Sequence, residues 1–316
     1  MNQDQLDQRA SLRSMTRGFY DLQKIRIQTG LRLVANYRAK LGLIETSKAT
    51  PDETSLFEDL DLETTDTEPT DEAVKAKKIA AATIMADLKK GYTRLTDAIA
   101  DNPDPTKPLG DPIIDSYAEW CLIGQYIEMV RLEAGQLKQI ERVVQAFTLY
   151  TDYLSNIKMV GPTTGAVLIT EIDIGKAKYV SSLWKYAGLD VAEDGRGRSW
   201  RKEHLVKRAY IDKKGKPQER DSITYNPFLK TKLFVFATNF IKGKNDYSVI
   251  YYNYKHRLES SKPDWTKGHR HNAALRYMMK MFLKDLYNYW RAAEGLPVMP
   301  PYDEAKLGHI HTKVAA

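Results

Sequence analysis

Apolar residues recur at alternating spacings of three and four between residues 117 and 156, and this repeat limits the available folds more than any other feature. A heptad pattern of this length favours a long helix in a coiled coil or helical hairpin. Gly124 and Gly135 weaken an isolated helix, so a partner helix must stabilise it. That partner is either the same segment of a second subunit or the helix expected at 73–101. The repeat comprises Ile123, Tyr126, Val130, Leu137, Ile140, Val144, Phe147 and Leu154, with Glu133 and Thr151 as interruptions.

The predicted fold is mainly α: a long coiled-coil helix followed by a helix-hairpin-helix domain with a small β-hairpin. Composition and periodicity divide the chain into five parts. They are an N-terminal helical segment at 1–50, an acidic disordered linker at 51–73, a helical hairpin or coiled coil at 74–156, the helix-hairpin-helix domain at 157–241, and a basic helical extension at 242–316.

Charge and cysteine content narrow the class of protein. Residues 51–73 carry ten acidic side chains and no Lys or Arg, yet the whole chain has a net charge of +7. Cys121 is the single cysteine of 316 residues, which excludes an internal disulfide and a thiolate metal cluster. The start, MNQDQLDQRA, is polar, and no apolar run approaches the roughly 20 residues that span a bilayer. A cytoplasmic protein without a membrane partner is therefore expected.

A glycine-proline pair interrupts the apolar stretch IKMVGPTTGAVLITEI at residues 157–172. Gly161 ends the preceding helix, and Pro162 suits the first turn of a new one. A helix, a tight glycine turn and a second helix form a helix-hairpin-helix element, in which free backbone N–H groups face a phosphate. A plain turn between two core helices has the same pattern, and Met159 stands where many such hairpins have their first glycine.

Two basic regions follow this bend. Residues 195–216 carry nine Lys and Arg against two acids, and residues 205–224 are typical of a β-hairpin with a lysine-rich tip. Residues 272–292 predict a helix with one apolar face and one row of cations. Dense positive charge attracts polyanions, so nucleic acid is the expected partner and a solvated basic surface is the alternative. The candidate nucleic-acid-binding residues are Lys158, Gly161, Thr163, Thr164, Arg196, Arg198, Arg201, Lys202, Lys207, Arg208, Lys213, Lys214, Lys216, Arg276, Lys280 and Lys284.

Two His-x-His pairs, His269/His271 and His309/His311, are the candidate zinc ligands. Residues two apart diverge on a helix, and neither a cysteine nor an ordered carboxylate joins them. Surface or capping histidines are therefore expected, and no metal or cofactor is predicted.

Several motifs occur in a fixed order over residues 157–189. They are the glycine hairpin, a small-residue helix with an acidic-aliphatic end, a basic-aromatic segment and the closing Tyr186-Ala187-Gly188-Leu189. This order resembles the C-terminal domain of the one-ten class of insertion-sequence transposases. The resemblance covers about residues 117–190, is looser over 190–241 and continues through RYMMKMFLKDLY and PPYDEAKLGHIH.

The resemblance implies movement of DNA by strand exchange directed by a guide RNA. In that family a ribonuclease-H-like domain with four acidic metal ligands acts together with a serine nucleophile of the C-terminal domain. The first 110 residues here do not show the strand pattern of the former, so we predict no metal site.

The family's serine lies shortly after the Tyr-Ala-Gly-Leu signature, where the first serine is Ser199. Arg196, Arg198 and Arg201 are near enough in sequence to neutralise the charge of an attacked phosphodiester. In the alternative interpretation Ser199 only donates a hydrogen bond within a phosphate-binding loop. Ser222 is a weaker candidate for the nucleophile.

The sequence therefore predicts a nucleic-acid-binding, transposase-like protein of DNA transposition or recombination, with a serine-dependent DNA strand-transferase as the candidate enzyme. DNA is the expected partner, with guide or structured RNA as an alternative, and residues 117–156 are expected to form a homo-oligomer. A separately supplied nuclease-like protein is a further candidate partner. One alternative is an inactive derivative that binds DNA or RNA as an accessory or regulatory factor. A second is a structural protein of a mobile element.

Overall fold

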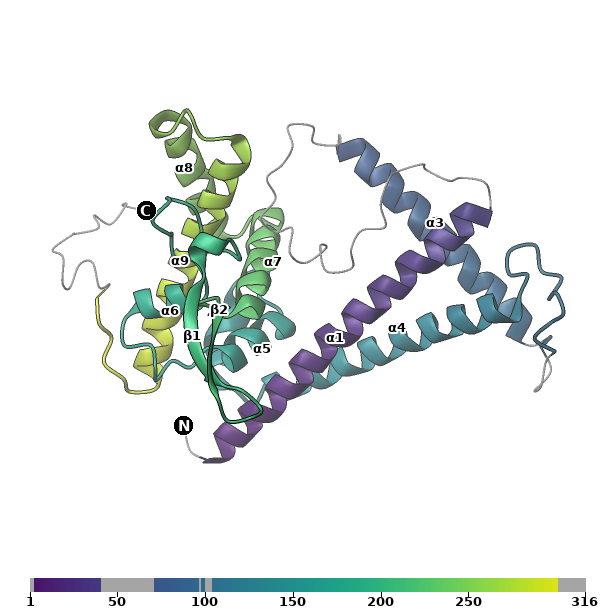
Figure 1. Ribbon diagram of the computed structural model, residues 1–316, viewed down its shortest axis with the longest axis horizontal. Helices are drawn as coiled ribbons and strands as arrows, with labels where there is room; N and C mark the ends of the chain where they lie inside the picture. The colour runs from purple at the N-terminus through teal and green to yellow at the C-terminus, as the bar shows by residue number, and fades with distance from the viewer. Residues whose placement is uncertain (1–2, 41–70, 97, 100–103, 301–316) are drawn as a thin grey trace. The chain divides into compact units, whose positions relative to one another are not determined.

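The computed structural model describes residues 3–40, 71–96, 98–99 and 104–300. Over these residues the chain is mainly helical, with one antiparallel two-stranded sheet (Figure 1). They group into two compact units, the α4 unit (14–40, 71–96, 98–99 and 104–141) and the α9 unit (3–13 and 142–300). None of the described helices is long and apolar enough to cross a bilayer. Most of the acidic tract predicted at 51–73, and the second His-x-His pair, lie outside the described residues.

Three long helices supply the α4 unit: α1 (Gln3–Lys40) from residue 14 onward, α3 (Asp71–Thr96), and α4 (Tyr117–Val144) as far as residue 141. Their core contains Leu33, Leu88, Leu95, Ile114 and Ile123. Within this unit the Tyr126 ring of α4 lies against Gly30 of α1, and the Tyr92 ring of α3 lies against Gly124 of α4. Self-association through 117–156 stays a prediction.

Contacts with neighbouring helices explain a glycine and a glutamate that interrupt the apolar pattern of α4. At Gly124 a Cβ would lie 3.0 Å from the Tyr92 ring of α3, so the glycine allows that ring to approach the α4 backbone. Glu133 forms an ion pair with Arg26 and accepts a hydrogen bond from Gln23 at 3.0 Å. The predicted long helix ends at Val144, and the chain continues as a π-helical turn, η1 (Leu149–Tyr153), and a 3₁₀ turn, η2 (Leu154–Asn156).

Helices α5 to α9 build most of the described part of the α9 unit, and α9 packs against α6, α7 and α8. The predicted apolar face of α9 is buried at Leu275, Met279, Phe282 and Leu286. Helix α5 packs against α7 and η1, and all its residues from Thr164 to Glu171 are buried. The elements are α5 (Pro162–Glu171), α6 (Val180–Tyr186), η3 (Lys202–His204), β1 (Val206–Ile211), β2 (Pro217–Ser222), α7 (Pro227–Gly243), α8 (Asp246–Ser261) and α9 (Lys267–Ala293).

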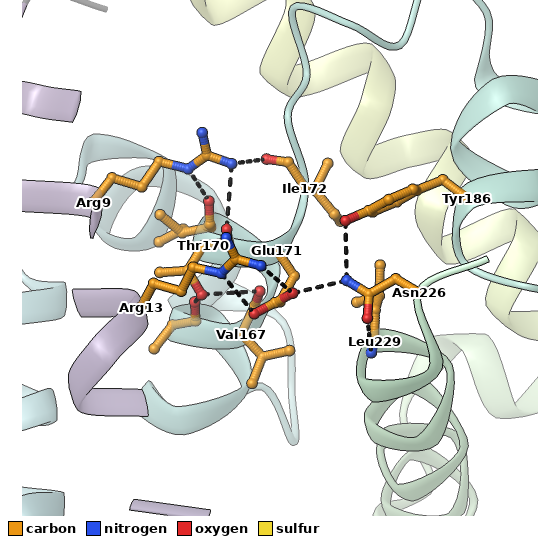
Figure 2. A network of polar contacts seen from close by, with 11 residues as sticks. Arg9, Arg13, Val167, Thr170, Glu171, Ile172, Tyr186, Asn226 and Leu229 are labelled. Atoms are coloured by element: carbon orange, nitrogen blue, oxygen red, sulfur yellow. Dashed lines mark hydrogen bonds and ion pairs between the residues drawn. The ribbon is translucent and has the colours of Figure 1, made fainter. Parts of the chain in front are cut away.

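A polar network ties the first turns of α1 to the C-terminal end of α5 (Figure 2). Arg9 donates to the carbonyls of Ile169 and Ile172 at 2.7 and 2.6 Å, where a helix leaves its last carbonyl groups without helical partners. Arg13 pairs with Glu171 at 3.2 Å. The amide of Asn226 donates to Glu171 at 2.8 Å, while its Oδ1 caps α7. One buried carboxylate therefore connects α1, α5 and α7.

The bend before α5 follows the sequence prediction in its local geometry. Gly161 is the N-cap and Pro162 occupies the first turn of α5. Met159 adopts a φ of 74°, a left-handed conformation that glycine accepts far more readily. Its side chain packs against Gly243 at the end of α7, and this contact holds the methionine in place.

We expect Gly165→Ala to destabilise the α9 unit by about 1–3 kcal/mol, because overpacking a filled core costs that much. A Cβ at Gly165 would lie 2.8 Å from Cε2 of the Tyr150 ring. Gly175→Ala is the matched control, since its Cβ would meet only Asp173 Oδ1, at 3.4 Å. Chemical denaturation measures both variants, and equal midpoints would contradict this packing.

Candidate functional site

The loop between α6 and β1, residues 187–205, is held in shape mainly by its own backbone. Val191 pairs with Gly197 as an isolated antiparallel bridge, and the Ala192 amide donates to the Arg196 carbonyl at 2.8 Å. Gly195, at a φ of 78°, makes the tight turn between them. This fold brings together side chains that the sequence places several residues apart.

Three side chains of this loop form a continuous chain of polar contacts. The Ser199 Oγ lies 2.9 Å from Nδ1 of His204, and Nε2 of His204 lies 3.1 Å from Oδ2 of Asp194. The Ser199 backbone N–H also donates to Nδ1, at 3.0 Å. Because that N–H needs an acceptor, Nδ1 carries no proton and the ring hydrogen is on Nε2, which donates to Asp194. Nδ1 has a single lone pair, so the Ser199 hydroxyl can donate a hydrogen bond to it only by sharing it with the Ser199 N–H.

A hydroxyl bonded to a neutral imidazole that is oriented by a carboxylate is an arrangement able to activate a serine. Ser199 and His204 are 3% and 2% exposed, and the side chain of Asp194 is 40% exposed. The Arg196 amide, which donates to the carboxylate at 2.9 Å, lowers the pKa of Asp194, and the His204 contact adds to this. Asp194 is thus kept ionised and holds the ring in one tautomer.

Cationic side chains from two elements meet beside this loop. Arg276 of α9 approaches the loop so closely that a Cβ on Gly197 would lie 2.8 Å from its Nη1. Burial, with the positive charges of Arg276, Arg196 and Arg201, lowers the pKa of His269 at the start of α9. We call Arg196, Arg201 and Arg276 the cationic cluster. It can attract a phosphate group to the region of Ser199.

The predicted binding residues differ in their surroundings. Arg198 is half-buried and paired with Asp190 at 2.9 Å. Thr164 is buried, and the ammonium group of Lys280 lies 5.4 Å from the Trp184 ring centroid. Residues that are half-buried are Gly161, Thr163, Arg201, Arg276 and Lys284. Residues that are exposed are Lys158, Arg196, Lys202, Lys207, Arg208, Lys213, Lys214 and Lys216.

Sequence reasoning named Ser199 but missed His204, Asp194 and His269. The usable signal was weak: Asp194 and His204 stand five residues to either side of the serine in a glycine-containing loop. The sequence predicts His269 to be a surface or capping histidine and not a zinc ligand. Its ring stacks on Trp265 at 3.9 Å between centroids, whereas His271 faces the Tyr251 hydroxyl. Among the described residues, no group of three or more His, Cys, Asp or Glu is placed to hold a metal ion.

Comparisons of this chain with protein-family models, with curated proteins and with solved structures find no match.

We expect the thermal stability of the protein to fall below pH 6.5 partly through His269. Its pKa in the folded chain is lower than the usual 6.5, so the fold favours the neutral ring and the unfolded chain binds the proton first. The stability that this group contributes is present above about pH 6.5 and is lost as the pH falls towards the folded pKa. Tm measured from pH 7.5 to 5.5 should decline less for His269→Gln than for the wild type. If Tm falls with pH equally for the wild type and His269→Gln, the lowered pKa of His269 would be contradicted.

Proposed function

We propose that this chain is a nucleic-acid-binding, transposase-like protein that acts in DNA transposition or recombination. The observation that carries the proposal is the chain of contacts from Ser199 through His204 to Asp194, beside the cationic cluster. A hydroxyl with an acceptor nitrogen at 2.9 Å is a candidate nucleophile. Guanidinium groups are the side chains best suited to hold the phosphodiester that it attacks. The resemblance of residues 157–189 to the one-ten class of transposases supports the same activity.

In the proposed reaction Ser199 Oγ attacks the phosphorus of a DNA strand, and its proton passes to Nδ1 of His204. The Oγ–P bond forms while the bond from phosphorus to one strand oxygen breaks, and that oxygen takes up a proton. Asp194 stabilises the imidazolium, and the cationic cluster stabilises the charge that develops on the phosphoryl oxygens. Because Ser199 is 3% exposed, the segment around Trp200, itself 60% exposed, has to open first.

A second contribution to binding is proposed for the bend at Gly161, as a helix-hairpin-helix element. Helix α5 has no side-chain cap at this end within the described chain. Because Pro162 has no N–H and Thr164 is buried, the contact with a phosphate oxygen is proposed for the amide of Thr163. Gly161 and Thr163 are half-exposed and Lys158 is exposed beside them. Such contacts hold a backbone without reading its sequence.

The binding-only alternative is favoured by one observation in the loop. The Arg201 amide donates to Ser199 Oγ at 3.3 Å, so the buried hydroxyl also has the contacts of a residue that only fixes the loop. In this alternative the chain is an inactive derivative that binds DNA or RNA as an accessory or regulatory factor. A structural role in a mobile element is the second alternative.

A covalent-adduct assay tests the proposal. The protein is incubated with supercoiled plasmid DNA, and a phosphoserine link is detected as DNA retained with protein on a denaturing gel. We expect the wild type and the control Ser222→Ala to form the adduct, and Ser199→Ala to form none. His204→Gln should slow adduct formation by about 100-fold or more, the usual effect of losing a general base.

Each remaining outcome decides between the alternatives. Adduct formation by Ser199→Ala at the wild-type rate removes this serine from the mechanism. A wild-type protein that binds the plasmid but forms no adduct is the binding-only derivative. A protein that does not bind nucleic acid at all is left with the structural role.

A further inference from the structure

The β1–β2 hairpin has no packed face. All six residues of β1 are exposed, as are those of β2 except the half-buried Ser222. The strands pair antiparallel from Val206 opposite Ser222 to Ile211 opposite Pro217 (Figure 1). An isolated two-stranded hairpin is marginally stable in water. The only strand residue that is not exposed is Ser222, at the end where the hairpin joins the rest of the described chain. We call β1, β2 and their connecting turn at 212–216 the ribbon.

The two faces of the ribbon carry different charges. Residues directly opposite one another share a face, and successive residues alternate between faces. One face holds Arg208 opposite Arg220 and Tyr210 opposite Gln218, and the Arg220 guanidinium lies 5.3 Å from the Tyr210 ring centroid. Over the strand residues, all of them described, this face has no acidic side chain. We call it the arginine face.

The opposite face is acidic in balance. Lys207 lies opposite Asp221, and Ala209 opposite Glu219, so this face carries one cation and two anions along the same strands. The lysines of the tip, Lys213, Lys214 and Lys216, belong to the turn and to neither face. Because side chains alternate between the two faces of the pleated strands, the ribbon has one positively charged face and one face with a net negative charge.

Two arginines directly opposite each other are an unfavourable pair, because like charges at this position of an antiparallel ladder repel. Water and salt screen the repulsion on an exposed ribbon but do not remove it. A polyanion against the arginine face would relieve it, whereas the acidic face would repel the same ligand. The charge pattern thus selects both the ligand and the side that it contacts.

We propose that the ribbon lies in the major groove of duplex DNA with its arginine face towards the bases. This inference rests on the proposed nucleic-acid-binding function and adds the element, the face and the groove. Six-residue strands are about 20 Å long, and the major groove, about 12 Å wide, admits a two-stranded ribbon. Arginine and glutamine are also the side chains that form paired hydrogen bonds with guanine and adenine in this groove. The lysines of the tip lie near backbone phosphates.

Fluorescence anisotropy with the full-length chain and a labelled mixed-sequence DNA duplex of about 20 base pairs tests the inference. In about 0.1 M salt, Arg208→Ala and Arg220→Ala should each weaken binding about tenfold, near the lower end of the effect of one lost paired contact with a base. Glu219→Gln is the matched control, because it changes the net charge by one unit at the neighbouring position on the acidic face. It should change Kd by less than twofold. Circular dichroism establishes that all three variants fold.

Two further ligands identify the groove. In one duplex the cytosines carry glucosylated hydroxymethyl groups, and the glucose fills the major groove. The wild type should bind this duplex as weakly as Arg220→Ala binds ordinary DNA. An RNA duplex of the same sequence, whose deep and narrow major groove excludes a ribbon, should bind wild type and Arg220→Ala equally.

Three results would overturn the inference. A gain in affinity from Glu219→Gln as large as the loss from Arg220→Ala would show that only total charge matters. An equal dependence on Arg220 for RNA duplex or single-stranded DNA would exclude the major groove. If the wild type binds DNA and no ribbon variant weakens that binding, the ribbon is not part of the binding surface, but the proposed function still holds. A wild type that binds none of these ligands would instead overturn the proposed function.

Discussion

Positive charge gathered beside the 187–205 loop and along the ribbon is what the packing of the α9 unit has to hold in place. Arg276 approaches Gly197 of the loop that also carries Arg196 and Arg201, and all three arginines act on His269. The ribbon repeats the situation with Arg208 opposite Arg220. Such groups stay together only if the rest of the fold is firm enough, and an anionic ligand would stabilise them.

That firmness comes from contacts away from the positive charges. Helix α9 buries an apolar face against α6, α7 and α8, which fixes Arg276 relative to the loop. Glu171 connects α1, α5 and α7 through Arg13 and Asn226. The same Asn226 places the start of α7 next to α6, because its backbone N–H donates to the Tyr186 carbonyl at 2.8 Å. Gly188, at a φ of 68°, then lets the chain turn over the Tyr225 ring. The loop that holds Ser199 begins directly after this turn.

Periodicity and cap residues made much of the α9 unit predictable. Pro162 after Gly161, and Pro227 after Asn226, start helices in the structure as their sequence positions indicate. A hairpin with a lysine-rich tip was predicted over residues 205–224, and the structure pairs Val206–Ile211 with Pro217–Ser222. The end of α4 at Val144 was not, because the apolar spacing continues into a π-helical turn and a 3₁₀ turn that also bury their apolar side chains.

The candidate site was less predictable than the fold. Ser199 stood out because of the basic residues around it, whereas the roles of His204 and Asp194 depend on the turn that Gly195 makes. No periodic pattern encodes such a loop. The charge separation across the ribbon needed the register of the two strands, because a shift of one residue would exchange its faces.

The affinity of the full-length chain for a DNA duplex as a function of salt concentration tests the central claim most directly. If Arg196, Arg201 and Arg276 contact phosphates, the logarithm of the association constant should fall with the logarithm of salt concentration with a slope of about −3 or steeper. A chain that does not bind at about 50 mM salt, or whose affinity does not change with salt, would contradict nucleic-acid binding by this surface.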